Sequence, residues 1–291
     1  MMQAFLDNRH ELGECVLWCE RTERLLWTDI PACQLWSYSP STGRSMYWPM
    51  PERLCSFALT TSDDCLLLGL ASGLAFFRFS SGTVERIADV EPEIPFTRLN
   101  DGRCDREGRF VFGMFNQEDA PKRALGGFYR LDTDLRLERL PIGNAAIANS
   151  ICFSPDGRTM YYADSATRAI RCCDYAHDGT ISRPRVFARP DAAAGDPDGS
   201  TIDAEGFLWN ARWGAGQVVR FAPDGRVDRI LALPARQPTC VAFGGPGLDV
   251  LYATSASVGL ADPAAGAGGL FAQGLDVRGL PEGRFGIATD A

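Results

Sequence analysis

Four side chains with oxygen donors, far apart in a chain of 291 residues, are suited to binding one cation: Glu14, Asn100, Asn149 and Asp198. Carboxylate and amide oxygens are hard ligands that suit Ca²⁺, Mg²⁺ or Mn²⁺ and are tolerated by Zn²⁺ or Fe²⁺. Because these residues are distant in the sequence, only the tertiary structure can bring them together.

Ordinary turns are the alternative explanation for part of this set. Asn100-Asp101-Gly102 and Asp198-Gly199 are typical turn sequences, as are Asp156-Gly157 and Asp224-Gly225 elsewhere in the chain. Glu14 is harder to explain in this way, because it stands at the start of the apolar run Cys15-Val16-Leu17-Trp18. A carboxylate buried there needs a partner. By themselves, the residues leave both a cation site and simple turns open.

The composition excludes several other kinds of catalytic chemistry. The chain has two histidines, His10 and His177, both expected at the surface, and its only lysine is Lys122. Histidine-based triads and lysine Schiff bases are therefore improbable, whereas a metal ion with carboxylates remains available. The formal net charge of −8 also argues against nucleic acid or an anionic membrane as a partner.

The ten cysteines and the apolar segments indicate a cellular location. No CxxC pair or zinc-ribbon spacing occurs, and most cysteines lie in apolar runs, where a free thiol behaves as a small apolar side chain. Met1 to Leu12 has no apolar core typical of a signal peptide, and no apolar stretch is long enough to span a membrane. We therefore expect a cytoplasmic protein with reduced thiols.

A repeat of short apolar runs and glycine turns extends through the chain. Copies begin near residues 25, 65, 110, 160, 207 and 250. This spacing, with several short strands per copy, is typical of a β-propeller. The sequence predicts an all-β protein, residues 1–291 forming a single six-bladed β-propeller domain with four antiparallel strands per blade. Met1 to Asn8 is either the outer strand of the last blade or a frayed terminus.

The predicted fold gives the four oxygen donors a common position. Each lies in a segment about ten residues upstream of a repeat copy, where the innermost strand of a blade is expected. Equivalent positions on innermost strands surround one end of the central channel. We therefore expect Glu14, Asn100, Asn149 and Asp198 to converge there, with a single metal site at the channel mouth.

Several motifs resemble those of the senescence-marker-protein/gluconolactonase/regucalcin family of six-bladed propellers, and they cover nearly the whole chain. They are Leu12-Gly13-Glu14 with Trp18, Leu26-Trp27-Thr28-Asp29-Ile30, Arg98-Leu99-Asn100-Asp101-Gly102, Ser154-Pro155-Asp156-Gly157, Pro197-Asp198-Gly199 and Phe243-Gly244-Gly245. Cys15 and Ser150 depart from the pattern, because the family usually has glycine at both positions.

The resemblance implies roles for individual residues. Glu14, Asn149 and Asp198 would bind one divalent ion (Ca, Zn, Mn, Mg or Fe), and Asn100 would lie beside the metal and the substrate. Arg98 and Glu118 would contact the substrate. Asp198 would also be catalytic, taking a proton from the attacking water. Glu118 lies in a polar loop, so it could equally be a solvent-exposed acidic residue without a role in substrate binding.

The function expected from these residues is metal-dependent hydrolysis of a sugar (aldono-)lactone to the aldonic acid, with a pentonolactone of oxidative sugar catabolism as one candidate. The partner would be this small molecule, with no nucleic acid and no membrane, and the protein a monomer or weak homo-oligomer. Two alternatives remain. One is a Ca-dependent ester or phosphotriester hydrolase of the same fold, favoured by an apolar pocket. The other is a non-catalytic metal-binding propeller.

Overall fold

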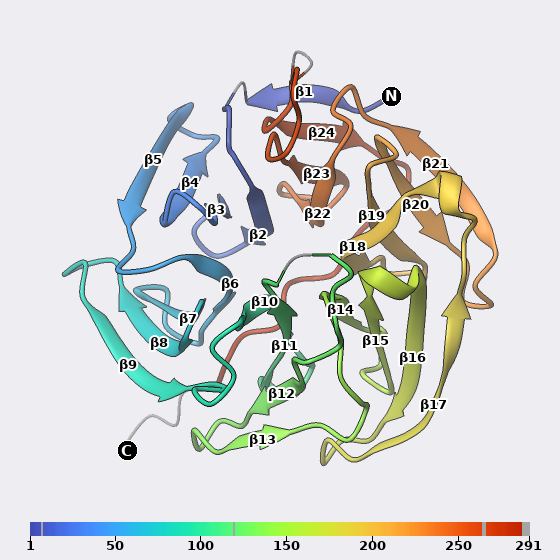
Figure 1. The fold of residues 1–291 in the computed structure, drawn as a ribbon. Coiled ribbons are helices and arrows are strands. Elements are labelled where there is room, and N and C mark those ends of the chain that lie inside the picture. Colours follow the sequence, from blue (N-terminus) through green and yellow to red (C-terminus); the bar gives the residue numbers. More distant parts are fainter. Residues whose placement is uncertain (7, 119, 264–265, 287–291) are drawn as a thin grey trace.

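Six four-stranded antiparallel sheets stand around a central channel in the computed structural model, which describes residues 1–6, 8–118, 120–263 and 266–286 (Figure 1). The predicted six-bladed propeller is thus confirmed. Each repeat copy begins at the second strand of its blade, where Val, Leu, Phe, Tyr and Trp form a buried pleated surface.

The strands of each blade are given from the channel outward. The first three blades are β2 (Gly13–Cys19), β3 (Arg24–Asp29), β4 (Gln34–Ser39), β5 (Arg44–Pro49); β6 (Leu54–Leu59), β7 (Cys65–Leu70), β8 (Gly73–Arg78), β9 (Val84–Asp89); and β10 (Thr97–Cys104), β11 (Phe110–Asn116), β12 (Phe128–Leu131), β13 (Leu137–Arg139). The next two are β14 (Ala148–Phe153), β15 (Thr159–Asp164), β16 (Ala169–Tyr175), β17 (Ile181–Ala188); and β18 (Asp196–Ile202), β19 (Leu208–Trp213), β20 (Gln217–Phe221), β21 (Val227–Ala232). The last is β22 (Pro238–Gly244), β23 (Val250–Ser255), β24 (Leu270–Gly274) and β1 (Gln3–Leu6).

The N-terminal strand closes the ring. β1 pairs antiparallel with β24, with Gln3 opposite Ala272 and Ala4 opposite Phe271. Of the two fates predicted for the first eight residues, the outer strand of the last blade is therefore the correct one. The last blade joins both ends of the chain, so separating the blades requires breaking this sheet.

Apolar packing between blades forms the core. Six buried clusters each join two neighbouring blades, including the pair that closes the ring. Between blades one and two, for example, Leu26 and Leu35 pack with Phe57, Leu68 and Phe77, all almost fully buried. Burying each such side chain stabilises the fold by ~1.5–3 kcal/mol.

Helical structure is confined to two 3₁₀ turns in the described chain, η1 (Ser165–Thr167) and η2 (Ala192–Ala194). Across the residues that the structure describes, there is no helix with the length and hydropathy that a bilayer crossing requires. All ten cysteines are free thiols, and only Cys33 is more than slightly exposed.

A bulge interrupts every innermost strand near its start. The register with the second strand shifts between Glu14 and Leu17 in β2, and between Asn149 and Cys152 in β14. The other four innermost strands shift at the corresponding place. An extra residue in a strand re-aims the neighbouring side chains. The bulges therefore lie where the predicted ligands must turn toward the channel axis.

The far end of the channel is crossed by the C-terminal segment, drawn in red in Figure 1. Gly279 forms a bridge with Asp203 after β18, and Phe285 forms one with Thr60 after β6. Glu282 accepts a 2.5 Å hydrogen bond from Arg103, whose side chain is buried. All these contacts are at the ends of innermost strands, so the starts of those strands surround the other mouth.

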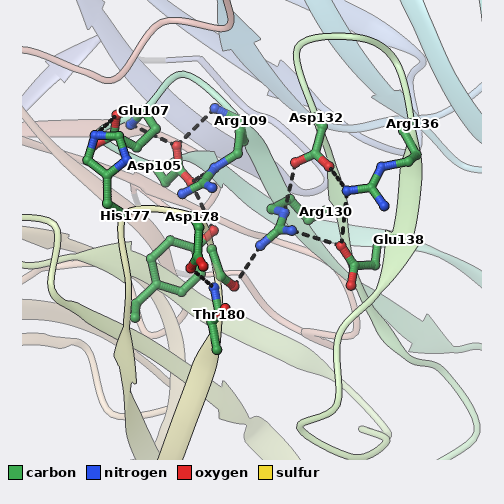
Figure 2. Close-up of polar contacts among 12 residues, drawn as sticks. Asp105, Glu107, Arg109, Arg130, Asp132, Arg136, Glu138, His177, Asp178 and Thr180 are labelled. Atoms are coloured by element: carbon green, nitrogen blue, oxygen red, sulfur yellow. Dashed lines mark hydrogen bonds and ion pairs between the residues drawn. The ribbon is translucent and has the colours of Figure 1, made fainter.

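A polar cluster joins blades three and four at the far end (Figure 2). Arg130 of β12 donates to the carbonyl of Gly179, in the turn after β16, and pairs with Asp132 and Glu138. Asp105 accepts from the Tyr175 hydroxyl at 2.8 Å. These contacts hold blades three and four in a fixed orientation relative to each other. The strand starts of the same two blades, at the opposite mouth, are thereby held in place as well.

His10 contradicts the expected surface position of the histidines, because it is 3% exposed. The Trp27 indole donates to His10 Nε2 at 2.8 Å, and His10 Nδ1 lies 3.2 Å from Asp29. A ring that uses both nitrogens in this way can be buried without an unpaired polar atom. The side chain of His177 is 88% exposed, as expected, and pairs with Glu107.

Candidate active site

One cavity of ≈ 360 Å³ opens at the channel mouth where the innermost strands start. Its polar wall contains five predicted site residues: Glu14, Arg98, Asn100, Asn149 and Asp198. Its apolar wall consists of Leu12, Phe115, Ile147, Trp213 and Val258. The propeller therefore brings the four oxygen donors together from four blades.

Glu14 and Asp198 line the same cavity, and each carboxyl group influences the pKa of the other. Burial, opposed by the Cys15 N–H, which donates to Glu14 Oε2 at 2.8 Å, raises the pKa of Glu14 to about 8. Burial and the negative charges of Glu14 and Asp101 raise the pKa of Asp198 well above its usual value. Two carboxylates held this closely cannot both ionise easily without a cation between them.

The amide of Asn149 has one defined orientation. Its Nδ2 donates to Ser165 Oγ at 2.9 Å, and the Ser165 hydroxyl donates its proton to the carbonyl of Pro197 at 2.7 Å. The hydroxyl can then only accept from Asn149, which leaves the Asn149 Oδ1 atom on the cavity side. There Oδ1 accepts a 3.2 Å hydrogen bond from Asn100. This is the orientation that a cation ligand requires.

Arg98 and Asn100 form the adjoining wall. Arg98 Nη1 donates to the side-chain oxygen of Asn100 at 2.7 Å, and its guanidinium lies 4.2 Å from the centre of the Phe115 ring. Asn100 donates from Nδ2 to the carbonyl of Ala148 at 2.8 Å. The oxygen of Asn100 accepts from the positively charged guanidinium of Arg98, which would repel a metal ion bound to the same oxygen. Asn100 is therefore better suited to lie beside a cation than to coordinate it.

Cys15 and Ser150, the two departures from the family glycines, both have left-handed backbones, with φ of 50° and 61°. Such a conformation favours glycine, so both positions carry local strain. The Ser150 hydroxyl donates to the carbonyl of Asp198 at 2.7 Å, and Asn210 Nδ2 donates to the same oxygen at 2.8 Å. The serine side chain thus holds the strand segment that carries Asp198.

The thiol of Cys15 packs in the buried cluster between blades one and two. The backbone N–H of Phe57, in the neighbouring blade, donates to Cys15 Sγ at 3.3 Å. Burial raises the pKa of the Cys15 thiol far above its usual value. Cys15 is therefore a packing residue rather than a nucleophile, since the thiolate is the reactive form.

Glu118 lies in the loop after β11, and its carboxylate is turned toward Arg123 rather than lining the cavity. Arg123 Nη2 lies 2.6 Å and 2.8 Å from the two carboxylate oxygens. Pairing with Arg123, helped by a hydrogen bond from Asn116, lowers the pKa of Glu118. The residue of this loop that lines the cavity is Lys122.

Sequence reasoning did not place Lys122, Ser165 or Trp213 at this site. Ser165 directly follows β15, whose end pairs with the start of β14 beside Asn149, and this place was the available signal. Trp213 ends β19, the strand beside Asp198. For Lys122, the only feature in the sequence that could have drawn attention to it is that it is the only lysine of the chain.

The protein is thus a six-bladed propeller with a cavity at one mouth of its channel, and carboxyl and amide side chains line that cavity. The chain matches the family model described as SMP-30/Gluconolactonase/LRE-like region over residues 12–257. It belongs to that family. The match spans all the innermost strands, so it includes each residue of the cavity that the sequence predicted.

Individual relatives are similar over almost the whole length. The chain is 52% identical to the L-arabinolactonase of Azospirillum brasilense over 96% of this chain and 93% of that protein. It is 35% identical to the 6-deoxy-6-sulfogluconolactonase of Pseudomonas putida, over 84% and 83%. The crystal structure of a calcium-binding protein, regucalcin, from Agrobacterium tumefaciens superposes with a TM-score of 0.92 at 30% identity, covering 98% of this chain and 97% of that one.

Proposed function

We propose that this protein hydrolyses a sugar lactone to the aldonic acid, using one divalent metal ion held by Glu14, Asn149 and Asp198. The observation that carries the proposal is the meeting of two carboxylates and an oriented amide oxygen with Arg98 in one cavity. The relative at 52% identity is an L-arabinolactonase, which makes a pentonolactone the first substrate to test.

The residues fit a divalent ion by their chemistry. Two carboxylates with one amide oxygen form an all-oxygen donor set, and the charge of a divalent ion balances Glu14 and Asp198. The regucalcin neighbour, which is a calcium-binding protein, supports this assignment. When bound, such an ion supplies Lewis acidity that polarises a lactone carbonyl.

The chain's own groups account for the proton transfer. Asp198 accepts a proton from the water whose oxygen bonds to the lactone carbonyl carbon. The bond from that carbon to the ring oxygen then breaks, and Asp198 returns its proton to the ring oxygen, which leaves as a hydroxyl. Arg98 has N–H groups beyond those bonded to Leu99 and Asn100, and these donate to substrate oxygens.

One observation favours an alternative substrate class. The five apolar side chains of the cavity would also suit an aromatic ester or a phosphotriester. The named lactonase relatives support the sugar lactone instead. Identity of the metal, cytoplasmic location and a monomeric or weakly associated state stay predictions from the sequence.

Turnover on a panel of substrates tests the proposal. Protein stripped with a chelator and then supplied separately with Ca²⁺, Mg²⁺, Mn²⁺, Zn²⁺ or Fe²⁺ would be assayed for acid release above the spontaneous rate. We expect fastest turnover with pentonolactones, slower turnover with hexonolactones and little with aryl esters or phosphotriesters. Preference for the last two would establish the alternative hydrolase. Metal binding without any turnover would indicate a non-catalytic propeller.

A further inference from the structure

We propose that Lys122 contacts the substrate and acts as a specificity residue of this cavity, donating a hydrogen bond to a substrate oxygen on the side away from Glu14 and Asp198. The inference rests on the proposed lactonase function and extends it to a residue that the sequence motifs do not identify. Lys122 lines the same cavity as the five predicted site residues.

Among the described residues, the ammonium group of Lys122 has two hydrogen-bond acceptors. Its Nζ donates to the carbonyls of Asn116 at 3.0 Å and Glu118 at 2.6 Å. A protonated lysine has three N–H donors, so one is not used by the residues that the structure describes. The same nitrogen lies 4.7 Å from the centre of the Phe115 ring, a cavity-wall residue that also contacts Arg98. These contacts come from its own loop and from a ring of the cavity wall, and Lys122 itself lines the cavity.

The loop that carries Lys122 is also stabilised by hydrogen bonds and an ion pair among its other residues. The buried Asn116 side chain accepts from the Glu118 backbone N–H at 2.9 Å and donates to the carbonyl of Arg123 at 3.0 Å. The ion pair between Glu118 and Arg123 adds a further link. These contacts do not involve the ammonium group, so removing it is expected to leave the loop in place.

The charges of the cavity indicate what Lys122 binds. A divalent ion balances Glu14 and Asp198, and Asp196 pairs with Arg168 at 2.9 Å. Arg98 and Lys122 then remain as two cations on one wall. Hydroxyl oxygens of a sugar lactone accept from such donors, and the carboxylate of the aldonate product is attracted still more strongly. An unsubstituted lactone has no hydroxyl to offer.

The consequence is a specific pattern of selectivity. A site that hydrogen-bonds a substrate hydroxyl discriminates strongly against an analogue lacking it. Lys122 therefore favours polyhydroxylated lactones over deoxygenated ones, and it makes the aldonate product a competitive inhibitor. Both effects concern binding, so they are expected in KM and in product affinity rather than in kcat.

The test compares Lys122→Met and Lys122→Arg with Arg136→Met in metal-replete protein. Arg136 is exposed in the turn between β12 and β13, outside the cavity, and its replacement changes the net charge equally. The measurements are kcat and KM for a pentonolactone and for unsubstituted γ-butyrolactone, the Kd of the pentonate by calorimetry, and the melting temperature.

For Lys122→Met we expect KM for the pentonolactone and the pentonate Kd to rise about tenfold, the effect of losing a charged hydrogen bond. The value of kcat and the KM for butyrolactone should change less than about threefold. Lys122→Arg should restore most of the pentonate affinity, and Arg136→Met should resemble the wild type.

Two results would overturn the inference. One is an unchanged pentonate Kd and KM in Lys122→Met. The other is an equal loss of kcat with both lactones together with a lower melting temperature, which would indicate a purely structural lysine. Absence of wild-type turnover on every lactone would contradict the proposed function instead, and the pentonate titration would then decide the role of Lys122 by itself.

Discussion

The Ser165 hydroxyl accepts a hydrogen bond from Asn149 Nδ2 at 2.9 Å and donates one to the backbone carbonyl of Pro197 at 2.7 Å. Through this relay the residue before Asp198 determines which way the Asn149 amide faces. One hydroxyl group thereby links the side chain of Asn149 to the backbone beside Asp198, in the neighbouring blade. A side-chain amide without such a partner could turn its nitrogen toward the cation and lose the ligand.

We expect Ser165→Ala to weaken metal binding about tenfold or more, the range found when groups that orient metal ligands are removed. Calorimetric titration with Mn²⁺ or Ca²⁺ measures this directly, without reference to activity. Thr167→Ala is the matched control, because Thr167 lies in the same 3₁₀ turn and bonds only to the carbonyl of Asp164. Equal metal affinity in both variants would contradict the orienting role.

Metal binding and proton transfer can be separated at Asp198. Asp198→Asn keeps an oxygen donor but removes the base, whereas Glu14→Gln removes only a charge. Both variants should bind metal more weakly, and saturating metal should restore lactonase turnover only in Glu14→Gln. The deficit left in Asp198→Asn should be about 10²- to 10⁴-fold, the contribution of a general base.

The outcome distinguishes two roles. If saturating metal restores Asp198→Asn as fully as Glu14→Gln, Asp198 is a ligand only. If neither substitution alters turnover, the cavity is not the active site.

Ser150 combines strain with a useful hydrogen bond, so its two simplest replacements should differ. Ser150→Gly relieves the left-handed backbone at φ 61° but loses the bond to Asp198, and the free energy of unfolding should change by less than ~1 kcal/mol. Ser150→Ala loses the bond and keeps the strain, so it should destabilise by ~1–2 kcal/mol. Urea unfolding of the three proteins tests this order, and an alanine variant as stable as the glycine variant would contradict it.

Acid stability should depend on Asp29. Burial opposes ionisation of its carboxyl group, but hydrogen bonds from His10 and from the N–H groups of Leu12 and Glu11 outweigh it and lower its pKa. A carboxyl whose pKa is lower in the folded state stabilises the fold above its unfolded pKa. That contribution is lost as the pH falls through the folded pKa, which lies below about 4.

Asp29→Asn should therefore lower stability at pH 7 by ~1–3 kcal/mol and flatten the fall in stability below about pH 4. Urea unfolding across pH 2.5 to 7 (about the range these pKa values span) measures both effects. Asp134→Asn, an exposed aspartate in the turn after β12, is the charge control. If the free energy of unfolding falls equally steeply below pH 4 in the wild type and in Asp29→Asn, Asp29 does not account for the acid sensitivity.

The chain's local patterns were sufficient to predict the blades. Short continuous apolar runs such as Leu66-Leu67-Leu68 and turns such as Asp224-Gly225 act over a few residues, so they can be recognised without knowing their neighbours. Because propeller blades repeat radially, Glu14, Asn149 and Asp198 could be assigned to equivalent places at one mouth. Their convergence followed from periodicity alone.

Only the tertiary structure decided how individual side chains are used there. His10 is buried because Trp27 and Asp29, on a different strand, happen to satisfy both ring nitrogens. The carboxylate of Glu118 is directed away from the cavity because it pairs with Arg123. Lys122 lines the cavity because two loop carbonyls accept hydrogen bonds from its ammonium group and hold it there. These outcomes depend on which donor meets which acceptor across non-repeating loops, where hydrogen-bond directions rather than hydrophobic periodicity set the conformation.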